Sequence, residues 1–242
     1  MKHVVSLVIG LTLLGGWVRA ESPLKIHMIS GSKEYKSEPS LKAFEKVLTE
    51  HYKVAVTASW VRDGAKDLPG IEHIPEADLL LVFARRMKLP EEQMKVIRTH
   101  WEDGKPVVGL RTSSHAFQKA DNERFDRKVM GGNYTGHYGK EAVAVKATEA
   151  GSKHPTLKGV GPFTSGKLYK AGELAEGAVT LQTGSIKGKP EQAVTWVHTY
   201  NGGRMFYSSA GVPTDFEDEN FRRMLMNAIF WTTRREPESM KR

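Results

Sequence analysis

The residues best suited to chemistry follow a short apolar stretch in the middle of the chain. Residues 106–110 read PVVGL and lead directly into Arg111 and the sequence TSSH. An arginine fork binds carboxylates, phosphates or hydroxyls, and a histidine exchanges protons near neutral pH. The sequence therefore predicts a site here, with Arg111 and His115 as catalytic candidates and Ser113 and Ser114 as ligand-binding candidates. In the alternative interpretation, Arg111 only ties the turn to an acidic neighbour.

A second candidate segment is the glycine-rich stretch 131–139, which reads GGNYTGHYG. Its glycines indicate a backbone that turns sharply or approaches another group closely. Asn133 and Tyr134 offer donors and acceptors to a hydroxyl-rich ligand, and His137 is a third catalytic candidate. His115 and His137 could form a general acid and base pair. A metal site is the less favoured alternative, because the 22-residue separation of the two histidines is no recognised ligand spacing.

Three more candidates follow other predicted strands. Glu34 and Tyr35 come after the first apolar run, and Arg85 comes after the run ADLLLVF at residues 77–83. The carboxyl ends of parallel strands meet at one edge of a sheet, where ligands bind. We therefore expect these side chains beside Arg111 as ligand-binding residues. Tyr169 and Arg204 are weaker candidates, since strand aromatics and arginines usually serve packing or surface charge.

The elements that must position these residues follow from periodicity. The first half of the chain alternates apolar runs with segments of helical spacing. Strands are predicted at residues 24–30, 53–59, 77–83 and 106–110, and helices at 40–52, 90–104 and directly after His115. This rhythm predicts a single α/β domain with a doubly wound, flavodoxin-like, mostly parallel sheet and helices on both faces.

The second half of the chain is less regular and indicates added antiparallel strands. Strand-like segments occur at residues 142–147, 167–171, 179–184, 193–200 and 204–209. The turn Asn201-Gly202-Gly203 is a strong hairpin signal. An amphipathic helix at residues 221–231 is predicted to close the domain.

Residues 1–20 are typical of a cleaved export signal. A short polar start precedes an uncharged run at residues 4–18, and cleavage is expected after Ala20. The run is shorter than the ~20 apolar residues of a spanning helix, so we expect no stable membrane anchor. The predicted organisation is a signal peptide at 1–20, an α/β domain at 21–234 and a flexible charged tail at 235–242. The location is then periplasmic or secreted.

Composition excludes several classes of function. The chain has no cysteine, which excludes disulfides and thiolate catalysis. Its formal charge of +8 falls to +6 without Lys2 and Arg19, and the basic residues are interleaved with acidic ones. No aromatic and basic stripe is present, so a nucleic-acid partner is not expected.

Several segments together resemble the ThuA-like, or trehalose-utilisation, family within the class I glutamine-amidotransferase-like superfamily. The matching segments are Glu34-Tyr35, SEPSL from Ser37, ADL from Ala77, FARR from Phe83, GLR from Gly109 through HAF from His115, the loop 131–139, His154-Pro155, Leu168-Tyr169, Gly203-Arg204 and residues 227–231. The resemblance covers nearly the whole chain after residue 20. It implies the superfamily fold and a carbohydrate-derived ligand, such as a sugar or keto-sugar.

The sequence departs from the superfamily at the positions that carry glutamine hydrolysis. The resemblance implies a nucleophilic cysteine two residues after Gly109, and Arg111 stands there. It also implies a Gly-His pair after a late strand, and the matching pair here is Gly211-Val212. Glutaminase activity is therefore not expected. The hypotheses left open are binding or transformation of a small carbohydrate, and a non-catalytic binding or scaffolding role. No cofactor is expected, a divalent metal is the alternative, and no oligomeric state is predicted.

Overall fold

The computed structural model describes residues 22–237. The predicted signal peptide and residues 238–242 of the predicted tail lie outside the described residues. Arg235, at the start of that tail, donates a hydrogen bond to the carbonyl of Ser22 and lies 3.4 Å from Asp78. No helix of the described residues is long and apolar enough to cross a membrane.

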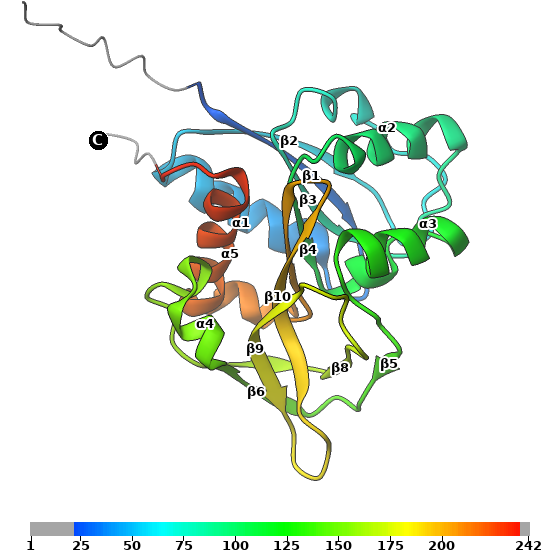
Figure 1. Cartoon of the computed structure of the whole chain (residues 1–242). Coiled ribbons are helices and arrows are strands. Elements are labelled where there is room, and N and C mark those ends of the chain that lie inside the picture. Colours follow the sequence, from blue (N-terminus) through cyan, green and yellow to red (C-terminus); the bar gives the residue numbers. More distant parts are fainter. Residues whose placement is uncertain (1–21, 238–242) are drawn as a thin grey trace, which may run out of the picture.

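A nine-stranded mixed sheet forms the centre of the domain (Figure 1). Its parallel half has the order β2-β1-β3-β4-β11, with the bounds Val54–Trp60, Leu24–Gly31, Leu79–Ala84, Val107–Leu110 and Gly203–Ser208. This is the flavodoxin-like order with its reversal at β1 and β3. The predicted fold class is confirmed.

Antiparallel strands extend this sheet on one side, as predicted for the second half of the chain. They are β10, β9, β6 and β7, with the bounds Gln192–Tyr200, Val179–Ser185, Ala142–Ala147 and Phe163–Gly166. Strand β7 is not among the predicted strands, and the predicted segment 204–209 is β11, which pairs parallel with β4. The predicted hairpin joins β10 to β11, and Asn201 and Gly202 both have positive φ, 46° and 80°. A separate small sheet pairs β5 (Gly136–His137) with β8 (Tyr169–Lys170).

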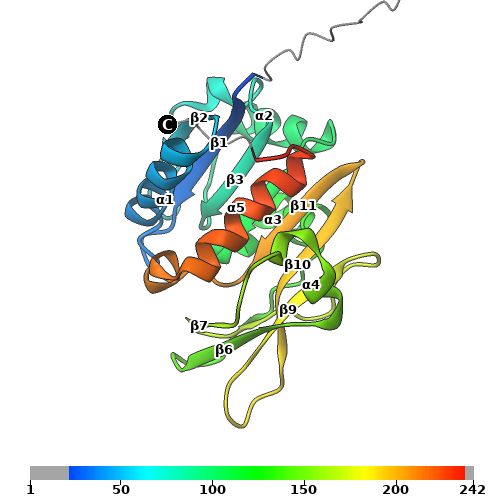
Figure 2. The ribbon, with the colours of Figure 1, turned by 90° about the vertical axis from the view of Figure 1, so that its left-hand side faces the viewer.

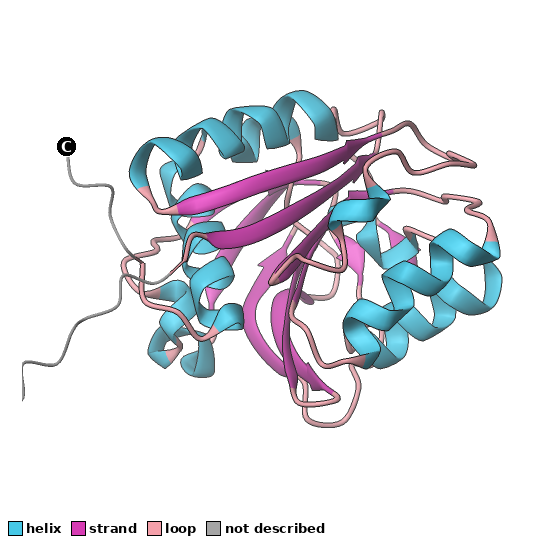
Figure 3. Ribbon diagram, turned by 90° about the horizontal axis from the view of Figure 1, so that it is seen from above, coloured by secondary structure: helices cyan, strands magenta, loops and turns pink. Residues whose placement is uncertain are grey.

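Helices cover both faces of the parallel half, as Figure 3 shows from above. Helices α1 (Ser37–His51) and α5 (Glu219–Thr233) lie on one face, where they are seen side by side in Figure 2. Helices α2 (Glu91–Glu102) and α3 (Lys119–Glu123) lie on the other face. Helix α4 (Glu149–Lys153) lies beside the antiparallel strands. The central strand β3 is buried at every residue because it is covered on both sides.

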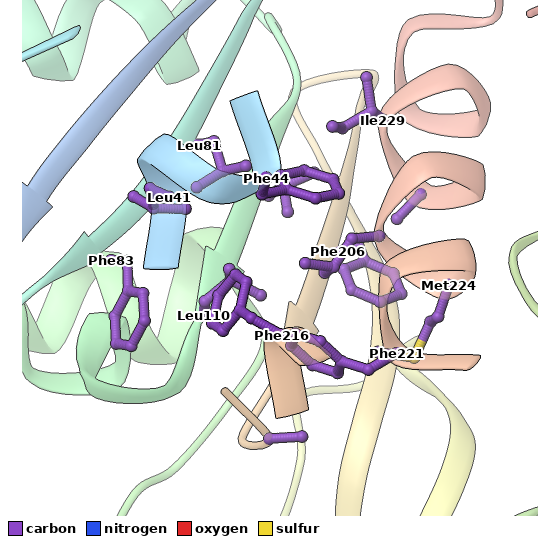
Figure 4. Packing of buried hydrophobic residues seen from close by; sticks show 14 of the residues in the cluster. Leu41, Phe44, Leu81, Phe83, Leu110, Phe206, Phe216, Phe221, Met224 and Ile229 are labelled. Atoms are coloured by element: carbon purple, nitrogen blue, oxygen red, sulfur yellow. The ribbon is translucent and has the colours of Figure 1, made fainter. Parts of the chain in front are cut away.

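Two hydrophobic clusters hold these layers together. The cluster under α1 and α5 brings Phe44, Phe83, Phe216 and Phe221 into one aromatic core (Figure 4). The rings of Phe83 and Phe216 stack at 6.1 Å and 10°. The cluster on the other face is built around Trp101. Packing on both faces holds β1, β3 and β4 in place. It therefore also holds the sheet edge that carries the candidate residues.

The segment after β4 differs from the predicted helix. Residues Arg111–His115 form a short 3-10 helix, and α3 starts only at Lys119. A π-helical turn, Arg124–Val129, follows α3 directly. Single π-helical turns are frequent at functional sites.

Two buried histidines make the stability of the fold dependent on pH. His27 is 0% exposed between the hydroxyls of Thr57 and Ser59, and His100 is 3% exposed with Nε2 donating to the carbonyl of Pro106. Burial lowers the pKa of each to about 4. The unfolded chain, with histidine pKa values near 6.5, therefore binds more protons between pH 6.5 and 4 than the folded chain does.

We expect the free energy of unfolding to fall as the pH drops from 7 to 4, by roughly 3 kcal/mol for each of these histidines. Asp126 acts in the opposite direction, since its pKa is raised to about 6. Urea unfolding at pH 7, 5 and 4 measures the net slope. The His27→Gln variant isolates one histidine and should show a shallower slope. An unchanged slope in this variant would contradict the assignment.

Candidate functional site

Arg111 stands in a strained backbone conformation directly after β4. Its φ is 48°, in the left-handed region that residues other than glycine seldom adopt. The strand ends at Leu110 with extended geometry, so the chain turns sharply at Arg111 itself. Strand, strained residue and helical turn make the elbow geometry that presents a nucleophile in enzymes of related architecture.

The side chain of Arg111 is nevertheless enclosed, with 1% exposure. Its guanidinium donates to the carbonyls of Ser209 and Lys167. It also lies between two aromatic rings, 4.5 Å from the centroid of Tyr35 and 4.3 Å from that of Tyr169. The sequence predicts a ligand contact for this fork, whereas in the structure it faces protein groups. No carboxylate of the described residues lies within ion-pair distance of it, so a tie to an acidic neighbour is not seen either.

Gly211-Val212 faces this elbow from the other side. A Cβ atom on Gly211 would lie 3.5 Å from Cβ of Arg111, so the two segments are in contact. The backbone N–H groups of Gly211 and Val212 both donate to Oδ2 of Asp215, at 2.6 and 3.0 Å. Asp215 is fully buried, and burial raises its pKa. The two positions at which superfamily chemistry is expected are thus adjacent, and neither carries a nucleophile or a base.

His115 is the candidate whose ring reaches a cleft. Its ring stacks on Tyr134 with a centroid distance of 4.7 Å and an angle of 21°. Its Nδ1 lies 3.1 Å from Oγ of Ser114. Burial, followed by the charges of Arg85 and Arg86, lowers the pKa of His115 to about 4. The imidazole is therefore neutral near pH 7 and has one nitrogen that accepts a proton.

The cleft beside His115 has a volume of about 620 Å³. Its walls carry amides, carboxylates, guanidinium groups and two aromatic rings, contributed by Arg86, His115, Phe117, Gln118, Asn122, Glu123, Asp126, Arg127 and Tyr134. Most of these residues come from the segment between β4 and the glycine-rich loop. Arg111 and His137 do not line this cleft.

His137 lies near the ring of Tyr169, outside the lining of the cleft beside His115. It is exposed on β5, and its Nδ1 lies 2.9 Å from the carbonyl oxygen of Tyr138. The rings of His115 and His137 are 6.2 and 6.3 Å from the ring of Tyr169. The sequence predicts these histidines near one pocket. In the structure they share an aromatic neighbour and make no hydrogen bond with one another.

Glu34 and Arg85 belong to an ion-pair network at the same sheet edge. Glu34 lies 2.5 Å from Lys167 and 3.7 Å from Arg85, and Arg85 lies 3.0 Å from Asp63. The hydrogen bond from Lys167 is the main reason that the pKa of Glu34 is lowered. These groups are partly exposed, so they remain accessible while holding one another in place.

The other predicted ligand-binding residues are buried or half-buried and do not line the cleft beside His115. Tyr35 is buried under Arg111, and Ser113 and Ser114 are buried in the turn. Oγ of Ser114 donates to the carbonyl of Arg111, and Oγ of Ser113 has no partner. Asn133 is half-buried beside Gly172.

Asp126 is the main site residue that sequence reasoning missed. It is 5% exposed in the π-helical turn, and its Oδ2 accepts the backbone N–H of Tyr134 at 2.9 Å. Oδ1 is buried without a partner, and burial raises the pKa to about 6. The run RFDRKV around it carries three basic residues and this one acidic residue, and it contains no local signal that marks the carboxylate as a site residue. Within residues 22–237, no group of three or more acidic or histidine side chains is placed to hold a metal ion.

The sequence matches the family model for ThuA, trehalose utilisation, over residues 25–232. The chain belongs to the ThuA family. A search of curated proteins finds no match to it. The ThuA fold is class I glutamine amidotransferase-like, in agreement with the elbow at Arg111.

Several solved structures resemble this one over most of the length of the present chain. A ThuA-like protein from Bacteroides uniformis has a TM-score of 0.66 at 16% identity, over 88% of this chain and 93% of its own. A ThuA-like protein from Parabacteroides merdae has a TM-score of 0.66 at 16% identity, over 91% and 92%. A β-galactosidase from Bacillus circulans sp. alkalophilus has a TM-score of 0.60 at 13% identity, over 89% of this chain and 32% of its own. At these sequence identities, the similarity shows that the folds are alike and shows nothing about a shared activity.

Proposed function

We propose that this ThuA-family protein binds a small carbohydrate-derived ligand, a sugar or keto-sugar, in the cleft beside His115, and that it has no glutaminase activity. The observation that carries the proposal is the cleft itself, in which a neutral imidazole, a tyrosine ring and several amide and charged groups line about 620 Å³. Proteins hold hydroxyl-rich ligands with such planar polar groups and with aromatic faces. The family description, trehalose utilisation, supports the choice of a carbohydrate.

The roles of the predicted residues follow from their distance to this cleft. His115 and Tyr134 line the cleft and touch the ligand, and Asn133 directly precedes Tyr134 in the glycine-rich loop. Oγ of Ser114 lies 3.1 Å from Nδ1 of His115 and so positions this ring. Tyr35, Arg111 and Ser113 are buried and do not line the cleft. Glu34, Arg85 and their partner Lys167 form a charged wall at the same edge. His137 lies at a separate rim beside Tyr169.

In the catalytic form of the proposal, His115 accepts a proton from the bound sugar. A histidine with a pKa of about 4 is unprotonated at pH 7 but is a weak base there, so this form of the proposal requires the bound ligand to raise the pKa of His115. Arg111 is too enclosed to touch the developing negative charge, so it acts as a positioning residue.

We also propose that the protein is exported to the periplasm or the outside, on the basis of residues 1–20 alone.

A thermal-shift screen against sugars and keto-sugars tests the proposal, because a ligand of the native state raises the melting temperature. We expect at least one member of the panel to stabilise the protein. In the His115→Gln variant, we expect affinity for that ligand to fall about tenfold or more, the value of one good hydrogen bond. His137→Gln is the matched control and should bind normally. Stabilisation that survives in His115→Gln would contradict the proposal.

A non-catalytic binding or scaffolding role is the second candidate, and the enclosed side chain of Arg111 favours it. With Arg111 at the position of the superfamily nucleophile, the protein keeps the fold of the superfamily without its nucleophile. Turnover of the ligand found in the screen separates the two forms. Catalysis predicts product formation that His115→Gln abolishes, whereas a binding role predicts unchanged ligand after incubation.

A further inference from the structure

A second cavity lies at the opposite edge of the sheet from the elbow. It has a volume of about 700 Å³. Arg204 stands at the start of β11, whereas Arg111 follows the end of β4, and these two strands are parallel. The cavity lies where α5 ends, beside the short 3-10 helix Pro155–Leu157. It shares no residue with the cleft beside His115.

The walls of this cavity are strongly cationic. They include five lysine and arginine side chains and one carboxylate, namely Lys153, Lys158, Arg204, Arg234, Arg235 and Glu236. Lys153 pairs with Glu149, and Arg235 pairs with Asp78. Among residues 22–237, no carboxylate lies within ion-pair distance of Lys158, Arg204 or Arg234. Three cations without an ion-pair partner among the described residues therefore line one cavity.

Trp231 supplies the rigid wall of the cavity. The guanidinium of Arg204 lies 4.7 Å from the Trp231 ring centroid, and its Nη1 donates to the Trp231 carbonyl at 2.7 Å. The ring of His154 meets the same indole edge to face at 4.7 Å and 65°. Asn227 donates to the carbonyls of Thr156 and Lys158 and so fixes the neighbouring loop.

Arg204 and Arg234 have hydrogen-bond donors left over after their contacts with the backbone. Arg204 and Arg234 each use one terminal nitrogen for a carbonyl, of Trp231 and Gly202 respectively. A guanidinium has five N–H donors, so most remain free for a ligand. Burial and the nearby charge of Arg234 lower the pKa of Arg204, which shows that the two cations repel one another. An anion between them would relieve this repulsion.

We propose that this cavity binds a small molecule that carries a phosphate group, with the phosphate among Lys158, Arg204 and Arg234. A phosphate dianion matches several cations better than a single carboxylate does, and arginine forks bind its oxygens two at a time. The indole of Trp231 offers a flat surface for the organic part of the ligand. Three segments that carry the family resemblance, His154-Pro155, Gly203-Arg204 and residues 227–231, meet at this cavity and have no place in the first site.

Calorimetric titration of the full chain at low ionic strength tests the inference, with glucose 6-phosphate, inorganic phosphate and glucose as probes. The cavity variant is Lys158→Met with Arg234→Asn. Lys158 is exposed, and asparagine tolerates the left-handed conformation of Arg234, whose φ is 56°. The control, Lys66→Met with Lys187→Met, removes the same charge from exposed positions elsewhere.

We expect saturable binding of a phosphate-bearing probe, no binding of glucose in the cavity, and affinity at least about tenfold lower in the cavity variant, since two charge-assisted contacts are lost. The control variant should bind as the unchanged protein does. The inference is overturned if neither phosphate probe binds, if binding of inorganic phosphate survives in the cavity variant, or if both variants lose phosphate binding equally. Binding of sugars beside His115 is measured separately and does not depend on this outcome.

Discussion

Replacing Arg111 with alanine is expected to lower the free energy of unfolding by about 4 kcal/mol, from a buried cavity and two unpaired carbonyl groups. The carbonyls are those of Ser209 and Lys167, which both accept from this guanidinium. The rings of Tyr35 and Tyr169 would also lose the cation between them. Urea unfolding at pH 7 measures the change. A loss below about 1 kcal/mol would show that the guanidinium is dispensable.

Arg111→Gly is the matched control for this variant. Glycine usually destabilises relative to alanine, but here φ is 48°, where alanine is strained by about 1 kcal/mol. We therefore expect the glycine variant to be more stable than the alanine variant by about that amount. The reverse order would contradict the strained elbow at this position.

Replacing Asp215 with alanine is expected to have the second large effect, about 3 kcal/mol or more, because three donors, two buried and one partly buried, lose their acceptor. Oδ2 of Asp215 accepts from Oγ of Ser165 at 2.6 Å and from the N–H groups of Gly211 and Val212. These bonds hold the segment that faces the elbow. The loss should appear as a lower urea midpoint with an unchanged slope.

Asp215→Asn and Ser165→Ala are the controls. The amide oxygen of asparagine can still accept the two backbone N–H groups, so we expect about half the loss seen with alanine. Ser165→Ala removes one donor and should cost about 1 kcal/mol. Equal stability of the alanine and asparagine variants would show that the backbone bonds contribute little.

The parallel half of the fold could be predicted because its strands leave a direct trace in the sequence. Residues 79–84, LLLVFA, are apolar throughout because β3 is buried on both faces. Strand β4 and its turn were equally visible from PVVGL followed by polar residues. Once the strand order is parallel, the carboxyl edge follows, and with it the neighbourhood of Glu34, Arg85 and Arg111.

The interior of the site could not be predicted, because it depends on contacts between distant residues. The enclosure of Arg111 needs Tyr35, which is 76 positions away, and the carbonyl of Lys167. No local pattern shows that two tyrosines will sandwich one guanidinium. Asp126 was missed for a similar reason, since only the bond to Tyr134 in the following loop distinguishes it from its charged neighbours.

The elbow after β4 carries Arg111, which is neither a nucleophile nor a base at neutral pH. Its backbone still adopts the strained turn after the central strand. The Arg111 side chain points into the protein, where its guanidinium donates to the carbonyls of Ser209 and Lys167. The open space lies one turn later, beside His115 and Tyr134.

The most direct test of this account is an NMR titration of the histidine ring resonances with the sugar that stabilises the protein. We predict a saturable shift of the His115 resonances, assigned by their absence in His115→Gln, with those of His137 nearly unchanged. The same spectra followed against pH should give His115 a pKa of about 4 without ligand. A ligand that shifts His137 and leaves His115 unmoved would contradict the proposed site.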